Sequence, residues 1–266
     1  MLGNFLQRNL RPLFKRIPLS LREKIADLIA LDESYSDFFS RASYNSDGLL
    51  TFHNADCLSS PEFLNAYLVG ENTGSWKGSD IRWRASVCCW AAQNCLNLDG
   101  DYVECGVNKG GMALTTIEYT NFSSIDKKYY LYDTFDGLHQ DLLTEEEVQI
   151  GIQAGRYEPC YEQVQDTFKQ YSNVIIVKGE VPSTLYQVSP KKVAYLAIDM
   201  NCVLPEIEAL RFFWDKLVPG AIILLDDYGW KNHYLQKKAF DEFALLYDIP
   251  ILQLPTGQGL LIKPAT

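Results

Sequence analysis

The feature that most constrains the fold is a regular alternation of short apolar strands with helical segments across the C-terminal two thirds of the chain. Strands are expected at 101–105, 129–132, 174–177, 193–198 and 221–225. Helical periodicity or helix start signals place helices at about 61–69, 80–98, 112–119, 141–154, 160–171, 205–217 and 231–247. Such alternation predicts a parallel sheet with helices on both faces, joined by right-handed crossovers.

The end of the chain departs from this alternation. Two apolar runs, 251–254 and 259–262, flank a turn at Pro255-Thr256-Gly257 and predict a terminal antiparallel hairpin. Five parallel units followed by a hairpin are typical of a class I methyltransferase domain rather than a dehydrogenase. We therefore predict an α/β, Rossmann-like fold with a mostly parallel seven-stranded sheet and an N-terminal helical extension.

Composition and charge exclude several classes of protein. The 266 residues carry a formal net charge of -10, which argues against general nucleic-acid binding. No apolar run approaches the roughly 20 residues that a transmembrane helix needs. The seven cysteines are odd in number and form no C-x-x-C pair, so we expect buried thiols in a reducing, cytoplasmic protein rather than disulfides or zinc.

Residues 1–30 differ from the rest because they hold six Lys/Arg against two acids. An apolar stripe that includes Leu2, Phe5 and Leu6 is interrupted at Pro12, and the segment lacks the features of a secretory signal. We expect an arm that docks on its own domain or on a second copy of the chain, and the second arrangement would form a homo-oligomer through the arm. A membrane-surface or partner-binding arm is the alternative.

Carboxylates follow two neighbouring buried strands. Asp199 comes directly after the apolar run 193–198, and Asp226 and Asp227 come directly after 221–225. Ligands of open α/β sheets bind at the carboxyl ends of the strands, and adjacent carboxylates repel each other unless a cation lies between them. A helix-capping role explains one such Asp, but three at strand ends favour a Mg²⁺ site with Asp199, Asp226 and Asp227 as ligands.

A glycine-rich turn follows the first strand of the alternation. Its spacing, G-x-x-x-G-G from Gly106 to Gly111, does not fit the dinucleotide fingerprint, and Glu104 just before it suits a cationic ligand such as S-adenosylmethionine. Asp133 ends the next strand, where a carboxylate is placed to accept the ribose hydroxyls of a nucleoside. His139 and His233 follow strand ends by several residues, and each is a candidate general base or a simple surface histidine.

In combination these residues resemble the TylF/macrocin O-methyltransferase family over about residues 100–264. The motifs that carry the resemblance are VECGVNKGG at 103–111, DTFDGL at 133–138, LAIDMN at 196–201, LVPG at 217–220 and LDDYG at 225–229. The family consists of Mg²⁺- and S-adenosylmethionine-dependent sugar O-methyltransferases of antibiotic and other natural product biosynthesis. The resemblance implies a methyltransferase domain at 99–266, with an N-terminal arm and helical cap at 1–98.

The resemblance also implies roles for individual residues. Glu104, Gly106 and Asp133 would hold the cofactor, together with neighbouring positions: Cys105, Gly110, Thr134, Phe135, Gly179, Glu180 and Asp199. Asp199, Asp226 and Asp227 would hold the metal, which would bind two adjacent oxygens of a glycosyl or other vicinal-diol acceptor, acidify its hydroxyl and align it with the methyl group.

One position departs from the family pattern. The family has D-x-D where this chain has Asp199-Met200-Asn201, and an Asn side chain cannot accept a proton at pH 7. Three outcomes stay open: His139 or His233 is the base, the metal-bound hydroxyl loses its proton to water, or the protein binds its ligands without methylating the usual sugars. Asn201 is also a candidate ligand of the metal or substrate. The alternatives to an enzyme of this family are a non-catalytic S-adenosylmethionine-binding module and, less favoured, a nicotinamide-dependent oxidoreductase.

Overall fold

The computed structural model describes residues 24, 36–37, 39–76 and 78–265. Apart from Lys24, the predicted basic arm at 1–30 lies outside the described residues. The chain divides into two compact units, one of residues 1–45 and 50–54, the other of residues 46–49 and 55–266. In the first unit, Ser43 bonds to Thr51 through both its backbone N–H and its hydroxyl. The division of the chain at residues 98 and 99 stays a prediction.

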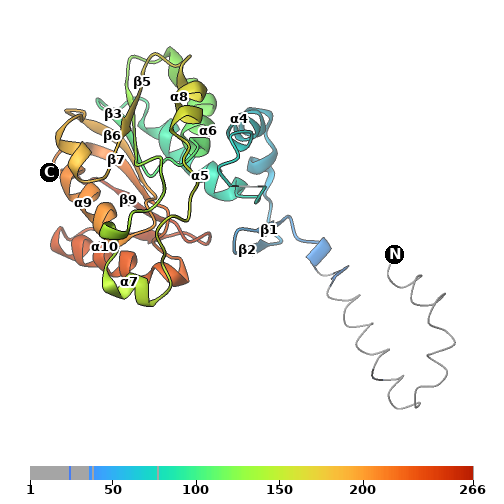
Figure 1. Ribbon diagram of the computed structural model, residues 1–266. Coiled ribbons are helices and arrows are strands. Elements are labelled where there is room, and N and C mark those ends of the chain that lie inside the picture. Colours follow the sequence, from blue (N-terminus) through green and yellow to red (C-terminus); the bar gives the residue numbers. More distant parts are fainter. Residues whose placement is uncertain (1–23, 25–35, 38, 77, 266) are drawn as a thin grey trace. The chain divides into compact units, whose positions relative to one another are not determined.

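The second unit contains the predicted seven-stranded sheet (Figure 1). Its strands are β3 (Asp101–Cys105), β4 (Tyr129–Asp133), β5 (Val174–Lys178), β6 (Val193–Ile198), β7 (Leu217–Leu225), β8 (Leu252–Gln253) and β9 (Gly259–Ile262). They lie in the order β5-β4-β3-β6-β7-β9-β8. Strands β3 to β7 are parallel, whereas β9 runs antiparallel to β7 and pairs with β8 as the predicted terminal hairpin. Two short strands, β1 (Tyr44–Ser46) and β2 (Leu49–Thr51), form a separate two-stranded sheet.

The helices follow the predicted alternation. They are α4 (Pro61–Glu71), α5 (Arg82–Cys95), α6 (Gly111–Thr120), α7 (Glu145–Gln149), α8 (Tyr161–Phe168), α9 (Val203–Trp214) and α10 (Tyr234–Leu246), with short 3-10 turns between several of them. Helix α4 begins as the sequence indicates, because the Ser60 hydroxyl accepts the N–H of Phe63 and proline occupies the first helical position. None of the helices in the described part of the chain has the length and apolar composition that a membrane span requires.

Two predicted segments differ from the structure. The helix expected at 141–154 is only a 3-10 turn at Gln140–Leu142 followed by the short α7, because Thr144 starts a new helix with a capping box and Gly151 ends it in a left-handed conformation. Strand β7 begins at Leu217 rather than Ala221. Its pairing with β6 at Val193, and the bond from the Gly220 N–H to the Lys263 carbonyl, extend the strand through Pro219 and Gly220.

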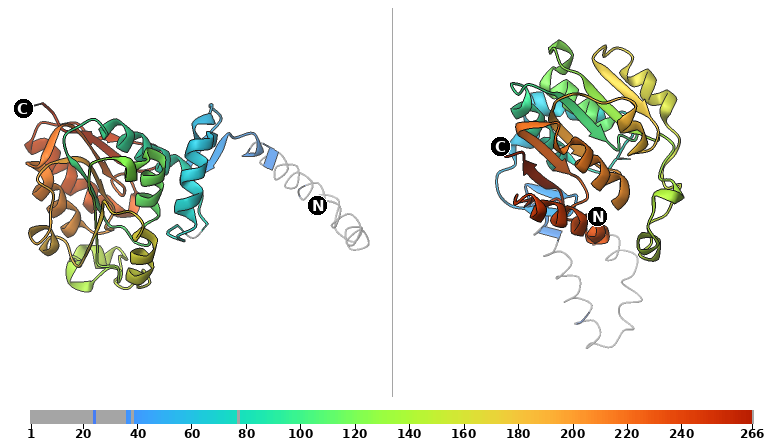
Figure 2. Two further views of the ribbon diagram at one scale, coloured as in Figure 1. Left: turned by 90° about the horizontal axis from the view of Figure 1, so that it is seen from above. Right: turned by 90° about the vertical axis from the view of Figure 1, so that its left-hand side faces the viewer.

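The two faces of the sheet pack against different helices (Figure 2). On one face, strand residues such as Tyr102 and Leu131 contact buried residues of α5, α6 and α8. On the other face, their neighbours Val103 and Tyr132 contact α9 and α10. Side chains of adjacent strand residues point to opposite faces, so the continuous apolar runs in the sequence are explained by burial on both faces.

The register of the parallel strands brings their carboxyl ends to one height. Cys105 pairs with Ile198, and Ile198 pairs with Leu225. The residues that directly follow these strand ends, Gly106, Asp199 and Asp226, therefore meet at one edge of the sheet. The connection that leaves β3 leads to β4 on one side, whereas the connection that leaves β6 leads to β7 on the other side. In open α/β sheets a crevice opens at such a switch point between adjacent strands.

Candidate active site

A cavity of about 550 Å³ lies at the carboxyl ends of the parallel strands. Most of the residues predicted for a site line it: Glu104, Gly106, Asp133, Thr134, Phe135, Gly179, Asp199, Asn201, Asp226, Asp227 and His233. The topology thus brings the glycine turn, the Asp133 strand end and the three carboxylates to one place. Cys105, Gly110, His139 and Glu180 are not among the described residues that line the cavity.

The glycine turn between β3 and α6 allows two close backbone approaches. Gly106 has a φ of +91°, and a Cβ atom there would lie 1.7 Å from the carbonyl oxygen of Asp199. Gly110 has a φ of +85° and packs on the ring of Phe168, which a Cβ atom would approach to 2.5 Å. A larger residue at Gly106 would separate β3 from the β6 end, and one at Gly110 would separate the start of α6 from α8. Gly106 lines the cavity, whereas Gly110 sets the packing beside it.

The Asp133 carboxylate accepts hydrogen bonds from two turns, the glycine turn after β3 and the turn that follows β4. Its Oδ2 accepts the backbone N–H groups of Val107 and Asn108 at 2.7 and 2.8 Å, and its Oδ1 accepts that of Phe135 at 2.6 Å. Three main-chain donors at one end of the sheet are thereby satisfied by a single carboxylate. This side of the cavity is held in shape by the chain itself.

Glu104 lies at the bottom of the cavity and is buried. Its Oε2 accepts the hydroxyl of Tyr129 at 2.9 Å. Burial raises the pKa of Glu104 to about 8, although the bond from Tyr129 opposes this shift. A cationic ligand in the cavity would favour the ionised form of this side chain.

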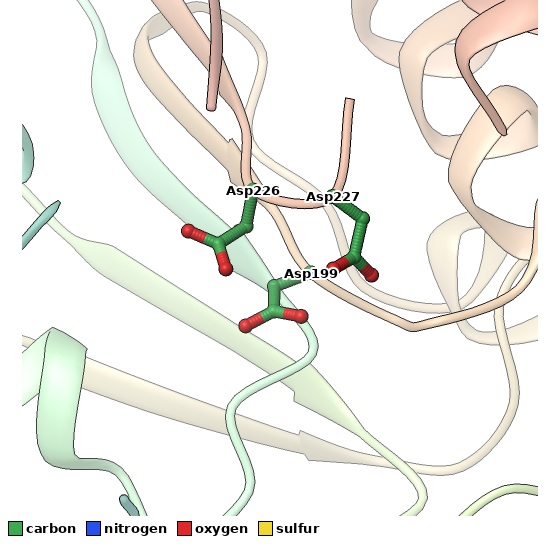
Figure 3. A group of neighbouring side chains, drawn as sticks. All are labelled: Asp199, Asp226 and Asp227. Atoms are coloured by element: carbon green, nitrogen blue, oxygen red, sulfur yellow. The ribbon is translucent and has the colours of Figure 1, made fainter. Parts of the chain in front are cut away.

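The three predicted metal ligands converge (Figure 3). Asp199, Asp226 and Asp227 each offer a carboxylate oxygen, and these oxygens lie within 4.8 Å of one another. Oδ2 of Asp227 is buried and has no hydrogen-bond partner among the described residues. Burial, together with the neighbouring Asp226 charge, raises the pKa of Asp227 to about 7, and the pKa of Asp199 is also well above its usual range for the same reasons.

This donor set fits a hard divalent cation. All three ligands are oxygens, as Mg²⁺ prefers, and the orphaned Oδ2 of Asp227 is a buried acceptor that lacks a donor. Without a cation the three carboxylates repel each other in a buried setting. The residues that would hold such an ion are Asp199, Asp226 and Asp227.

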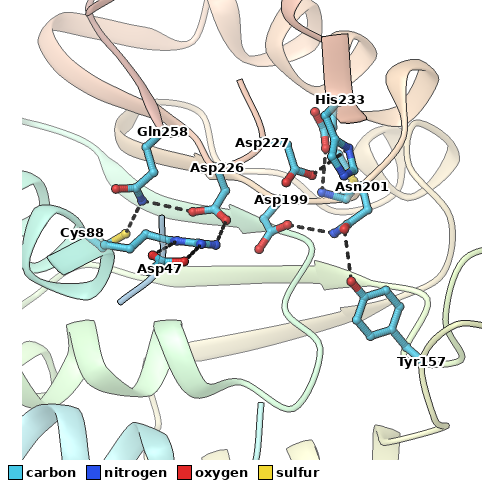
Figure 4. A network of polar contacts seen from close by, with 12 residues as sticks. Asp47, Cys88, Tyr157, Asp199, Asn201, Asp226, Asp227, His233 and Gln258 are labelled. Carbon is cyan, nitrogen blue, oxygen red and sulfur yellow. Dashed lines mark hydrogen bonds and ion pairs between the residues drawn. The ribbon is translucent and has the colours of Figure 1, made fainter. Parts of the chain in front are cut away.

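Asp226 has two further partners that sequence reasoning missed (Figure 4). Its Oδ2 accepts Nη1 of Arg84 at 2.6 Å, and its Oδ1 accepts Nε2 of Gln258 at 3.1 Å. Arg84 also forms a two-point ion pair with Asp47. The Asp47-Gly48 pair, with both residues at positive φ, is a recognisable turn signal. No local pattern shows that this turn contacts Arg84, which follows 37 residues later in the chain.

Asn201 links Asp199 to the far wall of the cavity. Its Nδ2 donates to Oδ1 of Asp199 at 2.9 Å, and its Oδ1 accepts the hydroxyl of Tyr157 at 3.1 Å (Figure 4). Both ends of the amide are therefore engaged, and the side chain orients Asp199. Tyr157 was not singled out by any sequence signal.

The two candidate bases lie in different settings. Nδ1 of His139 lies 2.6 Å from Oε1 of Glu180, and both side chains are partly exposed. His233 is buried at the cavity wall, with Nδ1 3.6 Å from Oδ2 of Asp227 and 2.6 Å from the side-chain amide of Gln236. Burial lowers the pKa of His233, with Arg156 adding to the shift, so its imidazole is neutral near pH 7. Of the two histidines, His233 lines the cavity, whereas His139 is not among the described residues that line it.

Comparisons with known proteins place this geometry in context. A family model described as Macrocin-O-methyltransferase (TylF) matches residues 86–250. The solved O-methyltransferase NovP is similar with a TM-score of 0.60 and 19% identity, over 68% of this chain and 80% of that chain. CalS11, a calicheamicin methyltransferase, has a TM-score of 0.53 and 16% identity, over 76% of this chain and 93% of that chain.

A third solved structure, SAH-bound PaMTH1 from Podospora anserina, has a TM-score of 0.51 and 16% identity, over 79% of this chain and 93% of that chain. No curated protein matches the chain significantly. At these identities the structural likenesses support the fold, and they confirm the predicted class I methyltransferase architecture, including the antiparallel pair that ends the sheet.

Proposed function

Since the chain belongs to the macrocin-O-methyltransferase (TylF) family and is therefore an O-methyltransferase, we propose that it transfers the methyl group of S-adenosylmethionine, with Mg²⁺, to a hydroxyl of a sugar or other vicinal diol. The observation that carries the proposal is the convergence of Asp199, Asp226 and Asp227 around a buried, unpartnered carboxylate oxygen. This acid cluster lines the same cavity as Glu104 and the glycine turn.

S-adenosylmethionine suits the β3–β4 side of the cavity. Its sulfonium and amine are cationic, and Glu104 and Asp133 supply negative charge there. The turn at Gly106 and the walls at Thr134, Phe135 and Gly179 would surround the nucleoside. The SAH-bound state of PaMTH1, a protein of the same fold, supports this choice of cofactor.

Asp199, Asp226 and Asp227 would hold Mg²⁺, which supplies Lewis-acid stabilisation of the acceptor oxygen when bound. Asn201, which is fixed by Tyr157, keeps Asp199 oriented toward the cluster. The neutral imidazole of His233 is the proposed proton acceptor, and the nearby Asp227 would stabilise the imidazolium. Asn201 does not replace the missing acid as a base, because an amide does not take a proton at pH 7.

The family assignment sets aside the non-catalytic binding module and the nicotinamide-dependent oxidoreductase. A thermal-shift series provides the direct test of the cofactor: S-adenosylhomocysteine should raise the melting temperature, and NADH should not. Methyl transfer from labelled S-adenosylmethionine to a panel of glycosides and diols should then require added Mg²⁺ and stop in EDTA. Undiminished transfer in EDTA would remove the metal from the mechanism, and stabilisation by NADH alone would overturn the proposal.

A further inference from the structure

Arg84 lies inside the acid cluster although it comes from the first turn of α5, far from the cluster in sequence. Its Nη1 is 2.6 Å from Oδ2 of Asp226, and its side chain is only 13% exposed. Nε and Nη2 bind the two oxygens of Asp47, whose side chain is 5% exposed. The guanidinium also lies 5.1 Å from the ring centroid of Trp230. Three of its five N–H groups are thus used to hold it between two buried acids.

The charges around this point are unequal. Four carboxylates, those of Asp47, Asp199, Asp226 and Asp227, gather here, and Arg84 forms ion pairs with two of them, Asp47 and Asp226. Arg156, which lines the same cavity, adds a second positive charge that acts on Asp227. A buried carboxylate without a counter-ion is costly, so the guanidinium stabilises the cluster before any metal binds. The same charge opposes a divalent cation, because both would be bound to the Asp226 carboxylate.

We propose that Arg84 is the resident counter-ion of the metal site: it shares Asp226 with the divalent cation, is held there by Asp47, and limits the affinity of the site for the metal. The inference rests on the proposed metal-dependent function and deepens it. It makes Arg84 a positioning residue that sets how tightly the acid cluster binds its cation.

Arg84 also orients Asp226, so its removal could weaken metal binding by leaving that carboxylate misplaced. Gln258 prevents this loss of orientation. Its Nε2 holds the other oxygen of Asp226 at 3.1 Å, and Gln258 is itself fully buried. Removal of Arg84 therefore leaves the carboxylate positioned, and the loss of repulsion dominates. We expect metal binding to become tighter when the charge of Arg84 is removed.

The test is calorimetric titration of the full chain with Mn²⁺ and with Mg²⁺, without methyl donor or acceptor. Arg84→Met should lower the metal Kd at least tenfold. Arg84→Gln, which keeps a hydrogen-bond donor without the charge, should lower it to the same extent, and this variant serves as the test if the Met variant does not fold. Arg84→Lys keeps the charge and should stay within about threefold of wild type. Asp47→Asn leaves the Arg84 charge less neutralised and should weaken metal binding.

The matched control is Arg82→Met, because Arg82 lies on the same first turn of α5 but pairs with the partly exposed Asp80, outside the acid cluster. Its metal Kd should equal that of wild type. A second readout is thermal: the rise in melting temperature on adding Mn²⁺ should be larger for the uncharged Arg84 variants than for wild type.

The outcomes separate this inference from the proposed function. Metal binding by wild type with an unchanged or weaker Kd in both uncharged Arg84 variants would overturn the role of Arg84 and leave the metal site standing. Absence of binding in wild type and in every variant would overturn the metal site and the inference together.

Discussion

Carboxylates on the two sides of the cavity differ in whether the protein itself supplies their hydrogen-bond partners. On the β3–β4 side, Asp133 is saturated by the backbone N–H groups of Val107, Asn108 and Phe135, so its charge is stabilised by the fold. On the β6–β7 side, Asp227 keeps a buried oxygen without a donor, and Asp199 and Asp226 lie close to it. The Asp133 carboxylate therefore needs no ligand to satisfy it, whereas the acid cluster of Asp199, Asp226 and Asp227 needs a cation.

The largest effect is expected from Asp227→Asn. The substitution removes one charge from the acid cluster and should lower methyl transfer at saturating S-adenosylmethionine about a thousandfold, on the order of 4 kcal/mol in the barrier. S-adenosylhomocysteine affinity should stay within about threefold, since Asp227 is on the other side of the cavity. The control is Asp215→Asn, at an exposed carboxylate after α9. Activity close to wild type would contradict the role of the acid cluster.

Asp133→Ala should act mainly on stability. It leaves three main-chain donors without their acceptor, which we expect to cost about 3 kcal/mol in the free energy of unfolding. Urea denaturation measures this loss, and Mg²⁺ should not reverse it. In contrast, Asp227→Asn should leave the metal-free protein as stable as wild type or more so, because it removes a buried carboxyl whose ionisation is disfavoured and whose Oδ2 has no donor among the described residues. Equal losses in the two variants would erase the distinction between the two sides.

The pH dependence of stability gives a third test. The carboxyl of Asp227 has a pKa of about 7 in the folded protein against an ordinary value of 3.8, so the folded state retains a proton that the unfolded state has lost. Its contribution to stability is fully present below pH 4 and is lost as pH rises through 7, by up to about 1.4 kcal/mol per pH unit.

The comparison that checks this pH dependence is urea unfolding of metal-free wild type and Asp227→Asn between pH 5 and 8. Over that range wild type should lose more stability than the variant, by about 2.6 kcal/mol. Saturating Mg²⁺ should reduce the slope for wild type, because a ligand that binds only the folded state adds stability where the carboxylates are ionised. Parallel pH profiles in the two proteins would show that Asp227 does not hold a proton in the fold.

The smallest effects distinguish the two histidines. His233→Gln should reduce the rate of methyl transfer about tenfold or more and remove the acidic limb of its pH profile, because the proposed proton acceptor, which is inactive when protonated at low pH, is lost. His139→Gln should change the rate less than about threefold, since His139 pairs with Glu180 away from the acid cluster. A loss in His139→Gln that exceeds that in His233→Gln would reverse the assignment.

Local patterns predicted much of the fold. The apolar runs at 193–198 and 221–225 are strands because they are buried on both faces, and Pro61 and the Ser60 cap start α4 as expected. The predicted helix at 141–154 and the predicted start of β7 at Ala221 were wrong. A capping box at Thr144 starts a separate short helix, and the pairing of Leu217 with β6 starts the strand earlier than the apolar run does. Such choices depend on which partner is nearby, and a local window does not contain that information.

For the site, the sequence by itself determined the chemistry at the strand ends: three carboxylates after two parallel strands, and a glycine turn beside an acid. Parallel strands in register must bring those ends together, so the acid cluster follows from topology alone. Only the tertiary structure decided which of these carboxylates have hydrogen-bond or ion-pair partners. Asp133 is satisfied by main-chain donors, Asp226 is shared with Arg84 and Gln258, and Asp227 keeps an oxygen unpaired. These differences arise from contacts between segments up to 142 residues apart, which no short-range pattern specifies.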